Sequence, residues 1–399
     1  MGQNNNVIAK SIKWSSLTEI GVKMITPVST MILARILDPE AFGVLAVCTM
    51  IVSFAEIIAD AGFGKYLVQA DFSDKDTMSR YASVAFWSHL AVALLLWTVI
   101  AVFSDSISTA LGAEGKPEVI IVACFQLVLM SMISTQLAIL RRQFLFKKTF
   151  IARICTVLGT FGITVPLALI LRSYWALIIG NLCGAFINLV VLTLMSGWKP
   201  KMYFSFDVFK NMFGFSFWSL CEGLAHWFIF WFDVFIVSQL YSTYYVGLYK
   251  NSTSIMLSLI GTITASMSPV LLSVLSRLKQ DNAYNDLYMK ISRLFMYLIL
   301  PLCLSVFFCR ELVTVILLGD KWMEATNIIG AWALMLGISV FIYSFPAEVY
   351  KSKGWPKYLF FYQLSYIIFL IPISFLSAKI GFWEFVYCRS GCIIAYFGR

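Results

Sequence analysis

Three ionisable residues fall on one stripe of an apolar segment in the second half of the chain. Glu222, His226 and Asp233 lie inside the hydrophobic run of residues 211–240. At ~100° per residue in a helix, His226 lies about 40° and Asp233 about 20° from Glu222 after whole turns, and Trp218 is close to the same stripe. Such a row can bind sugar hydroxyls, stack on sugar rings, or take up a proton or a sodium ion. The alternative is a polar contact of Glu222 and His226 with another helix, and an Asp233 at the outer membrane interface.

Other charged residues also occur within apolar runs. A charge in the hydrocarbon costs about 2.5–3.5 kcal/mol on insertion scales, so each one needs an explanation. Glu19 and Lys23 are spaced i,i+4, and they either neutralise each other on one helix face or line a cavity. Glu56 and Asp60 share a helix face that ends near the cytoplasmic side. We interpret them as gate candidates or as a solvated helix end.

Basic residues near the ends of apolar runs suggest contacts with phosphate. Arg35, Arg172 and Lys250 have the charge to contact a diphosphate, or they mark the outer interface. A second group lies between two apolar runs and either attracts anionic lipid headgroups or determines topology. This basic cluster consists of Arg141, Arg142, Lys147 and Lys148.

The composition predicts the elements that must position these residues. The chain has 399 residues, of which 60% are hydrophobic and 13% charged, and the mean hydropathy is +0.83. Soluble domains are roughly half apolar and a quarter charged, so this chain is expected in a membrane. The net charge of +9 comes from short loops between apolar runs, which argues against nucleic acid as a partner. The nine cysteines are scattered, and we expect no metal site.

Apolar runs of about twenty residues are long enough to cross the hydrocarbon. A final run, residues 385–397, is too short to cross. The eleven predicted spans are residues 14–34, 41–66, 81–103, 119–140, 154–171, 173–196, 211–240, 251–276, 294–309, 325–347 and 358–378.

The distribution of basic residues predicts the orientation. With the N-terminus in the cytoplasm, twenty Lys and Arg residues fall on the cytoplasmic side and six outside. This asymmetry follows the positive-inside rule. No signal-peptide cleavage site follows the first apolar run, so we expect that run to remain as an anchor.

Short strings at the ends of spans predict an internal repeat. Leu240 lies 203 residues after Leu37 in similar turns, and Gly319 lies 207 residues after Gly112. We therefore expect two lobes, residues 1–198 and 199–399, each built on a six-helix plan. Both lobes would have the same orientation and be related by an axis along the membrane normal. The expected fold is an all-α polytopic membrane protein.

Several of these strings resemble one family of exporters. The chain is similar to the Wzx-type flippases of polysaccharide and O-antigen synthesis, which belong to the multidrug/oligosaccharidyl-lipid/polysaccharide exporter superfamily. It is most similar to the WzxC-like lipopolysaccharide, colanic-acid and teichuronic-acid exporters. The strings are LARILDPEAFG (residues 33–43), DAGFGKYLVQ (60–69), Asp233 before VGLY (246–249), and LLGDKW (317–322).

The resemblance implies a fold and an activity. The fold would be two six-helix lobes around a central cavity, as in multidrug exporters of the same superfamily. The activity would be export of undecaprenyl-pyrophosphate-linked sugar units to the outer leaflet of the cytoplasmic (inner) membrane. Besides this lipid-linked oligosaccharide, the implied partners are membrane lipids and the polymerase and glycosyltransferases of the pathway. The stretch 388–399 does not resemble the family, so the second lobe is expected to be incomplete, with five full spans and a short last segment.

The chain shows no nucleotide-binding loop and no nucleophile–base signature. We therefore expect a transporter without catalytic residues or a cofactor, working by alternating access coupled to H⁺ or Na⁺. Asp233 and Glu222 are the first candidates for the coupling residues. Three alternatives stay open: a multidrug/cation antiporter of the same superfamily, a sugar-polymerising membrane enzyme, and an inactive fragment.

Overall fold

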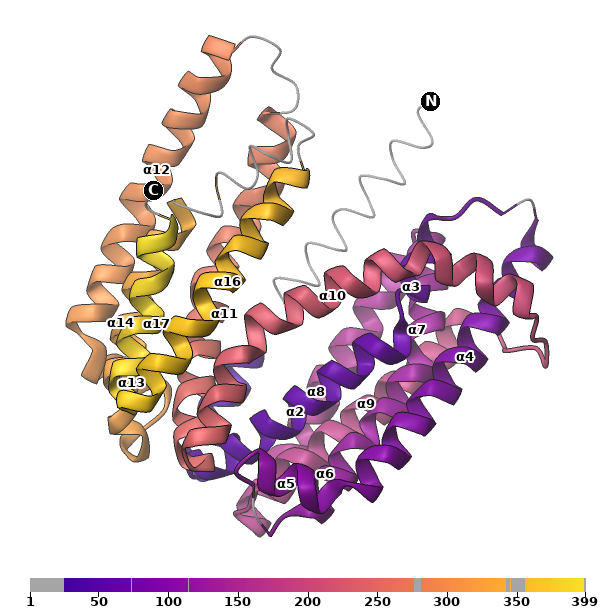
Figure 1. Cartoon of the computed structure of the whole chain (residues 1–399), viewed down its shortest axis with the longest axis horizontal. Coiled ribbons are helices and arrows are strands. Elements are labelled where there is room, and N and C mark those ends of the chain that lie inside the picture. The colour runs from indigo at the N-terminus through magenta and orange to yellow at the C-terminus, as the bar shows by residue number, and fades with distance from the viewer. Residues whose placement is uncertain are drawn as a thin grey trace. The chain divides into compact units, whose positions relative to one another are not determined.

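The computed structural model describes residues 25–72, 74–113, 115–275, 281–341, 345 and 356–397, and the regular elements in these ranges are all helices. The expected all-α fold is therefore confirmed (Figure 1). Of the first predicted span, the helix Ile25–Ile36 is described. Glu19 and Lys23 lie outside the described residues.

The chain forms two compact units that divide between Gln239 and Leu240. We call Met1–Gln239 the N-terminal unit and Leu240–Arg399 the C-terminal unit. The N-terminal unit contains α2 (Pro39–Asp60), α3 (Phe63–Gln69), α4 (Lys75–Val102), α5 (Ser104–Ala110), α6 (Pro117–Cys124), α7 (Gln126–Arg142), α8 (Phe146–Leu171), α9 (Tyr174–Ser196) and α10 (Phe206–Leu240), which ends at the division. The C-terminal unit contains α11 (Thr243–Leu275), α12 (Asp281–Phe308), α13 (Arg310–Leu317), the 3₁₀ helix η1 (Asp320–Ala325), α14 (Thr326–Ser339), α16 (Pro356–Ile380) and α17 (Phe382–Phe397).

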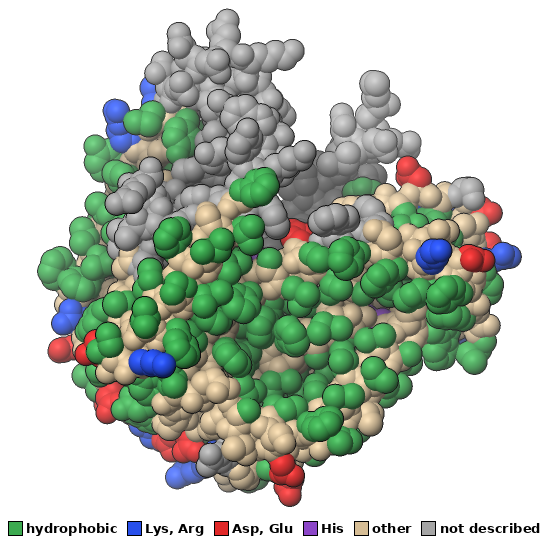
Figure 2. All heavy atoms as spheres, viewed as in Figure 1, with side chains coloured by type: hydrophobic (Ala, Val, Ile, Leu, Met, Phe, Trp, Pro, Cys, Tyr) green, Lys and Arg blue, Asp and Glu red, His purple; other side chains and the backbone are tan. Residues whose placement is uncertain are grey.

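The described helices have the lengths and surfaces that a membrane requires. Among the described residues, seven helical stretches are long and apolar enough to cross a bilayer. Hydrophobic side chains are spread over the face in Figure 2, and most of the charged side chains lie near its margins. A soluble fold would bury such side chains, so the chain is a multi-pass membrane protein. The seven stretches are Pro39–Asp60, Lys75–Val102, Pro117–Arg142, Phe146–Leu171, Tyr174–Ser196, Ser219–Leu240 and Tyr288–Phe308.

The structure breaks the second predicted span into two helices. Residues 41–66 were expected to form one helix, but α2 ends at Asp60 and α3 begins at Phe63. Between them, Ala61 and Gly62 both have left-handed backbone conformations, with φ of 45° and 81°. A Cβ at Gly62 would lie 2.8 Å from the Cβ of Ser219 on α10. Glycine therefore serves both the turn and the close approach of α10.

Helix starts follow local rules of capping. Pro39 occupies the first turn of α2, where no main-chain N–H is needed. The Asp74 carboxylate accepts a hydrogen bond from the main-chain N–H of Thr77 at 2.5 Å and caps α4. This hydrogen bond holds the pKa of the Asp74 carboxyl below its ordinary value.

Contacts sort the loops of the N-terminal unit into two ends. At one end, Lys201 forms an ion pair with Asp76 (2.8 Å). At the other end, Lys116 pairs with Glu40 (2.7 Å), and the Gln239 amide donates to the main-chain carbonyl of Ala110. The alternation of spans inferred from the sequence requires this grouping. Helix α10 therefore runs from the first end to the second.

Each unit contains a long helix that is followed directly by a short one. α4 and α12 each have 28 residues, and each is followed by a short helix, α5 or α13. Gly112 and Gly319, which follow these short helices, both have positive φ, 65° and 91°. The division at Gln239 groups α10 with the helices it packs on, whereas the predicted boundary at residue 198 follows the repeat. The six-helix lobes and a cavity between them stay a prediction.

Candidate functional site

One face of α10 packs along α2 and α3. The Trp227 Nε1–H donates to the Ser53 hydroxyl at 2.9 Å, and the Trp227 ring centroid is 4.8 Å from that of Phe54. Gly223 lies one turn earlier, where an added Cβ would be 3.1 Å from Ile57. At ~100° per residue, the stripe of Glu222, His226 and Asp233 lies roughly a quarter turn from this packed face. The polar stripe therefore flanks the α2–α10 contact.

The first part of the stripe contains an ion pair that the sequence did not reveal. Lys65 of α3 donates to the Glu222 carboxylate at 2.9 Å. The His226 ring stacks near Phe230, with centroids 4.5 Å apart. Both charged side chains of the pair are exposed, 54% for Lys65 and 72% for Glu222, so its contribution to stability is at most about 1 kcal/mol. A pair of this strength can open when a charged ligand arrives.

The stripe changes character along α10. Glu222 and His226 are exposed, whereas Asp233 is buried, with 4% of its surface accessible. Trp218 belongs to α10, but its side chain lies outside the described ones. The structure therefore brings Glu222 and His226 together with Lys65, whereas Asp233 is buried further along α10.

A second set of polar side chains lies between α2, α4 and α7. The Ser134 hydroxyl of α7 donates to Asp60 Oδ1 at 2.7 Å, and His89 Nδ1 of α4 is 3.7 Å from the same oxygen. Asp60 is the last residue of α2, its side chain is 29% exposed, and it contacts side chains of α4 and α7. Glu56 lies one turn earlier on α2 and is half-buried. We call Glu56, Asp60, His89 and Ser134 the α2 polar cluster.

Sequence reasoning missed His89. The chain has two histidines, and His89 lies in the run of residues 81–103, which was classified as apolar because it contains no Lys, Arg, Asp or Glu. In the structure its side chain is 3% exposed, and its Nε2 atom has no hydrogen-bond partner among the residues that the structure describes. A buried imidazole is costly without partners. Treating histidine as an ionisable residue would have identified it.

The three basic candidates occupy different settings. Arg35 is exposed near the end of the helix Ile25–Ile36. Arg172 is also exposed and ends α8 in a left-handed conformation, with φ of 44°. Lys250 is half-buried on α11, where its main-chain carbonyl accepts the Thr253 hydroxyl at 3.1 Å. A role of these residues in diphosphate binding stays a prediction.

The arrangement provides charged and polar groups along one set of helices. Lys65, Glu222 and the α2 polar cluster belong to α2, α3, α4, α7 and α10 of the N-terminal unit. These groups can bind a polar headgroup or exchange a cation. Within the described residues, no three His, Cys, Asp or Glu side chains are arranged to hold a metal ion.

Comparison with known protein families adds a second line of support. A family model described as "Polysaccharide biosynthesis protein" matches residues 32–327. The chain is 27% identical over 344 residues to the succinoglycan biosynthesis transport protein ExoT of Rhizobium meliloti (strain 1021), covering 84% of this chain and 67% of the relative. It is 22% identical over 221 residues to the lipopolysaccharide biosynthesis protein WzxC of Escherichia coli (strain K12), covering 54% and 43%. The chain thus spans about two thirds of the length of the first relative and less than half of the second.

Solved structures share the fold. The lipid II flippase MurJ, in an inward closed conformation, matches with a TM-score of 0.78 at 15% identity, covering 97% of this chain and 86% of that chain. An inward-facing multidrug resistance MATE family transporter of the MOP superfamily matches with a TM-score of 0.69 at 11% identity, covering 96% and 95%. At these identities the likeness establishes the fold and leaves the transported molecule open.

Proposed function

Because the chain belongs to the polysaccharide biosynthesis protein family, we propose that it is a flippase for undecaprenyl-pyrophosphate-linked oligosaccharides. It moves these units from the cytoplasmic to the outer leaflet for the synthesis of surface polysaccharide. The observation that carries the proposal is the similarity to a succinoglycan biosynthesis transport protein over 84% of the chain. The fold shared with a lipid II flippase supports it, because lipid II is also a lipid-linked sugar.

The proposed mechanism is ion-coupled alternating access, in which the binding site opens to one side of the membrane at a time. A bound proton or Na⁺ neutralises a carboxylate, and neutralisation removes the cost of holding a charge away from water. A cation can therefore shift the balance between two conformations by its different affinity for each. Asp233 is buried in an apolar helix, and Glu222 has an exposed partner in Lys65. These two carboxylates are our candidates for the coupling residues.

The proposal includes a cellular setting. The protein would lie in the cytoplasmic (inner) membrane. Its N-terminus would be in the cytoplasm, because the Lys and Arg residues concentrate in the loops on the same side as the N-terminus. Its substrate would be made by glycosyltransferases on the cytoplasmic side and consumed by a polymerase on the outer side. Those enzymes are the proposed protein partners. Transport itself makes and breaks no covalent bond, so we do not assign enzymatic activity.

Replacement of Asp233 tests the coupling. Asp233→Asn keeps the shape of the side chain and removes its charge. We expect normal insertion and a tenfold or greater loss of export, equivalent to about 1.4 kcal/mol or more in the transport barrier. Glu222→Gln should act in the same direction but more weakly, because the Lys65–Glu222 pair is exposed. The measurement is accumulation of the undecaprenyl-linked intermediate in the cytoplasmic leaflet of cells that depend on this chain for export.

The matched control is Glu118→Gln, which removes an exposed charge in the first turn of α6 and should leave export unchanged. Export by Asp233→Asn at the parent rate would exclude Asp233 from coupling. A parent chain that extrudes cationic dyes, and does not restore polysaccharide to a strain lacking its own exporter, would instead identify the antiporter that the MATE fold allows.

A further inference from the structure

The two ring nitrogens of His89 have different surroundings in the middle of α4. Nδ1 lies 3.7 Å from Asp60 Oδ1, whereas Nε2 is buried and has no hydrogen-bond partner among the described residues. An acceptor beside one imidazole nitrogen favours the tautomer that carries its hydrogen there. The lone pair is then on Nε2, which is the ring atom that can accept a further proton.

Asp60 is held in place beside this imidazole. The Ser134 hydroxyl donates to Asp60 Oδ1 at 2.7 Å, and a Cβ added at Gly64 of α3 would lie 3.4 Å from both of these oxygens. A carboxylate beside Nδ1 stabilises the imidazolium that forms when the ring takes up a proton. A charged N–H···O hydrogen bond spans about 2.7–2.9 Å, so a movement of about 1 Å would form it.

The nearest other charges come from α2 and α3. Glu56 lies one turn before Asp60 on the same face of α2 and adds a second carboxylate to the cluster. Lys65 of α3 forms its ion pair with Glu222 of α10. Asp60 is therefore the charged group that faces His89 directly, and the carboxylates of α2 make the surroundings of the imidazole negative.

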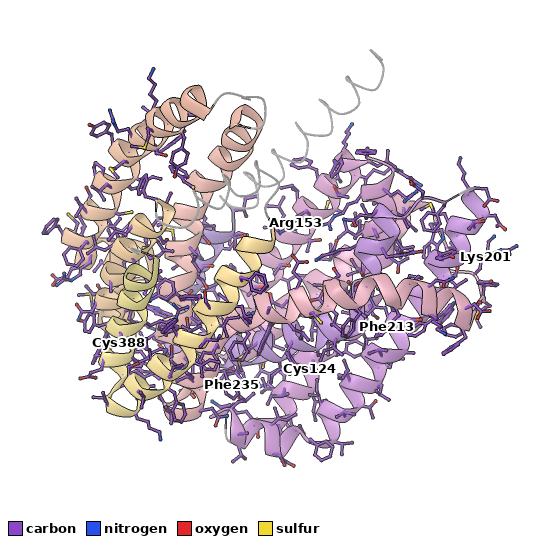
Figure 3. The ribbon with its side chains drawn as sticks, turned by 45° about the horizontal axis from the view of Figure 1, so that its top comes forward. Cys124, Arg153, Lys201, Phe213, Phe235 and Cys388 are labelled. Carbon is purple, nitrogen blue, oxygen red and sulfur yellow. The ribbon has the colours of Figure 1, made fainter. Side chains whose placement is uncertain are left out.

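The remaining charged groups on α4 and on the helices packed against it lie within two turns of a helix end. Figure 3 labels Lys201 at one such end, where it pairs with Asp76 in the first turn of α4. The other charged residues of these helices are Glu40, Lys75, Arg80, Asp105, Glu118, Arg141 and Arg142, and the titratable groups that are ordinarily neutral are Cys48, Tyr66, Tyr81 and Cys124.

One proton changes the charge balance of the pair. Without it, Asp60 and a neutral His89 together carry one negative charge among apolar helices. With a proton on Nε2, the pair becomes imidazolium and carboxylate and carries no net charge. The step forms an N–H bond and breaks an O–H bond of a hydronium ion, which leaves water. Because a net charge away from water is costly, uptake of the proton relieves that cost.

The pair lies at the break between two helices. Asp60 ends α2, and Ala61 and Gly62 turn the chain into α3 through left-handed conformations. A Cβ at Gly62 would lie 2.8 Å from the Cβ of Ser219 and 3.0 Å from the main-chain carbonyl oxygen of Ser216, both on α10. A movement of Asp60 toward His89 therefore acts where α2, α3 and α10 meet.

We propose that His89 and Asp60 form a proton-binding site in the N-terminal unit, which takes its proton at His89 Nε2 and moves the break between α2 and α3. Hard metal cations prefer a shell of several oxygen ligands, whereas this site presents an imidazole beside one carboxylate and one hydroxyl. A role of the site in export rests on the proposed function, but proton binding at His89 does not.

NMR spectroscopy of labelled histidine tests the site directly, because the chain has two histidines. His226→Gln leaves His89 as the single histidine of the full chain, which is studied in lipid nanodiscs without a histidine tag. At high pH the His89 signals should show an unprotonated Nε2, and they should titrate between about pH 4 and 8.

A second carboxylate variant identifies the partner of His89. In the His226→Gln background, Asp60→Asn should lower the affinity of His89 for the proton about tenfold or more, since a neighbouring opposite charge changes this affinity by about 1–3 pH units. Asp105→Asn is the matched control, because it removes an exposed carboxylate in the first turn of α5, and it should have no effect.

Three results of the titration would overturn the site. They are a His89 that stays neutral down to about pH 4, a high-pH tautomer with its hydrogen on Nε2, and equal midpoints for Asp60→Asn and Asp105→Asn. Replacement of sodium chloride by choline chloride should leave the midpoint unchanged. A shift with sodium would show that Na⁺ competes with the proton, which would overturn the assignment to a proton alone.

His89→Gln tests the role of the site in export. Glutamine can still donate to Asp60 but cannot take up a proton, so export should fall tenfold or more and lose its dependence on the pH outside the cell. Export by this variant at the parent rate, with the parent pH dependence, would overturn the role in transport. If the parent chain exports no lipid-linked sugar, the proposed function fails, and the titration of His89 still decides the proton site.

Discussion

At the scale of single residues, Asp60 is the acceptor on which the α2 polar cluster depends. Asp60→Ala leaves the Ser134 hydroxyl without its acceptor and His89 without its neighbouring charge. An unsatisfied buried polar group costs about 1–3 kcal/mol. We expect the midpoint of thermal unfolding in detergent to fall by several degrees, since ~1 kcal/mol corresponds to about 2–4 °C in a unit of this size.

Two further variants make the test specific. Asp60→Asn retains an oxygen acceptor for Ser134, so it should lose less stability than Asp60→Ala. Asp207→Ala removes an exposed carboxylate in the first turn of α10 and serves as the control. Equal unfolding midpoints for Asp60→Ala and Asp207→Ala would show that the cluster contributes no stability.

The same scale shows what sequence reasoning can find. Glu222, His226 and Asp60 were found because an ionisable residue in an apolar run needs an explanation. Their partners could not be found, because Lys65, Ser134 and His89 come from other helices at sequence separations that no periodicity encodes. The pairing of Glu222 with Lys65 depends on the packing of α10 along α3, which is a property of the tertiary structure.

At the scale of elements, α8 and α9 pack through small residues. Gly180 and Gly184, one turn apart on α9, face Thr164 and Thr160 on α8, and neither glycine has room for a Cβ. Close packing of this kind holds membrane helices together in the absence of a hydrophobic driving force. Gly180→Leu should therefore force the helices apart and lower the yield of folded protein in size-exclusion chromatography.

Gly162 is the matched control for this contact. It also lies inside a membrane helix, but a Cβ there would meet no atom of the described residues within 4 Å. Gly162→Leu should leave the folded yield at the parent value or raise it slightly, because glycine is a poor helix former. If Gly162→Leu lowered the yield as much as Gly180→Leu, backbone effects rather than helix packing would explain both.

Another element depends on one side chain. Arg142 donates to the carbonyls of Leu67, Val68 and Ala70 at the end of α3, and its guanidinium lies 4.7 Å from the Phe72 ring centroid. Hydrogen bonds to a charged group contribute about 1.5–3 kcal/mol. Arg142→Gln should therefore speed amide hydrogen exchange in residues 63–72 by tenfold or more.

The neighbouring cation provides the comparison for Arg142. Lys147→Gln removes one exposed charge from the same loop region and should leave exchange in residues 63–72 unchanged. Protection of this segment in Arg142→Gln at the parent level would mean that packing alone holds α3 in place.

Element boundaries were predicted less well than element types. The expected span of residues 294–309 corresponds to α12, which begins earlier, at Asp281, and ends at Phe308. The expected helix of residues 41–66 is broken instead, because Gly62 adopts a left-handed conformation against Ser219. A glycine in an apolar run does not by itself show whether the helix continues, since the deciding contact comes from α10.

At the scale of the whole molecule, the order of the spans was predictable, because an apolar run of about twenty residues indicates a helix that crosses the membrane. The contacts of Lys201 with Asp76 and of Lys116 with Glu40 group the loops of the N-terminal unit as that order requires. Loops of the C-terminal unit form one such group too, because the Tyr241 hydroxyl donates to the main-chain carbonyl of Ala378. The grouping defines two ends, and the charge of the loops is needed to assign each end to a side of the membrane.

Reporter fusions assign the sides. Lys201 precedes α10 at the end that carries the larger number of basic residues, so a fusion there should read cytoplasmic. Gln239, at the other end of α10, contacts Ala110, so fusions at Lys116 and Thr243 should both read external. The fusion partner would be alkaline phosphatase, which is active outside, or green fluorescent protein, which fluoresces inside.

A cytoplasmic reading at Thr243 combined with an external reading at Lys116 would contradict the path of α10 through the membrane. Cytoplasmic readings at Lys116 and Thr243, with an external reading at Lys201, would agree with the fold but reverse its orientation. The positive-inside rule would then no longer support export from the cytoplasmic leaflet.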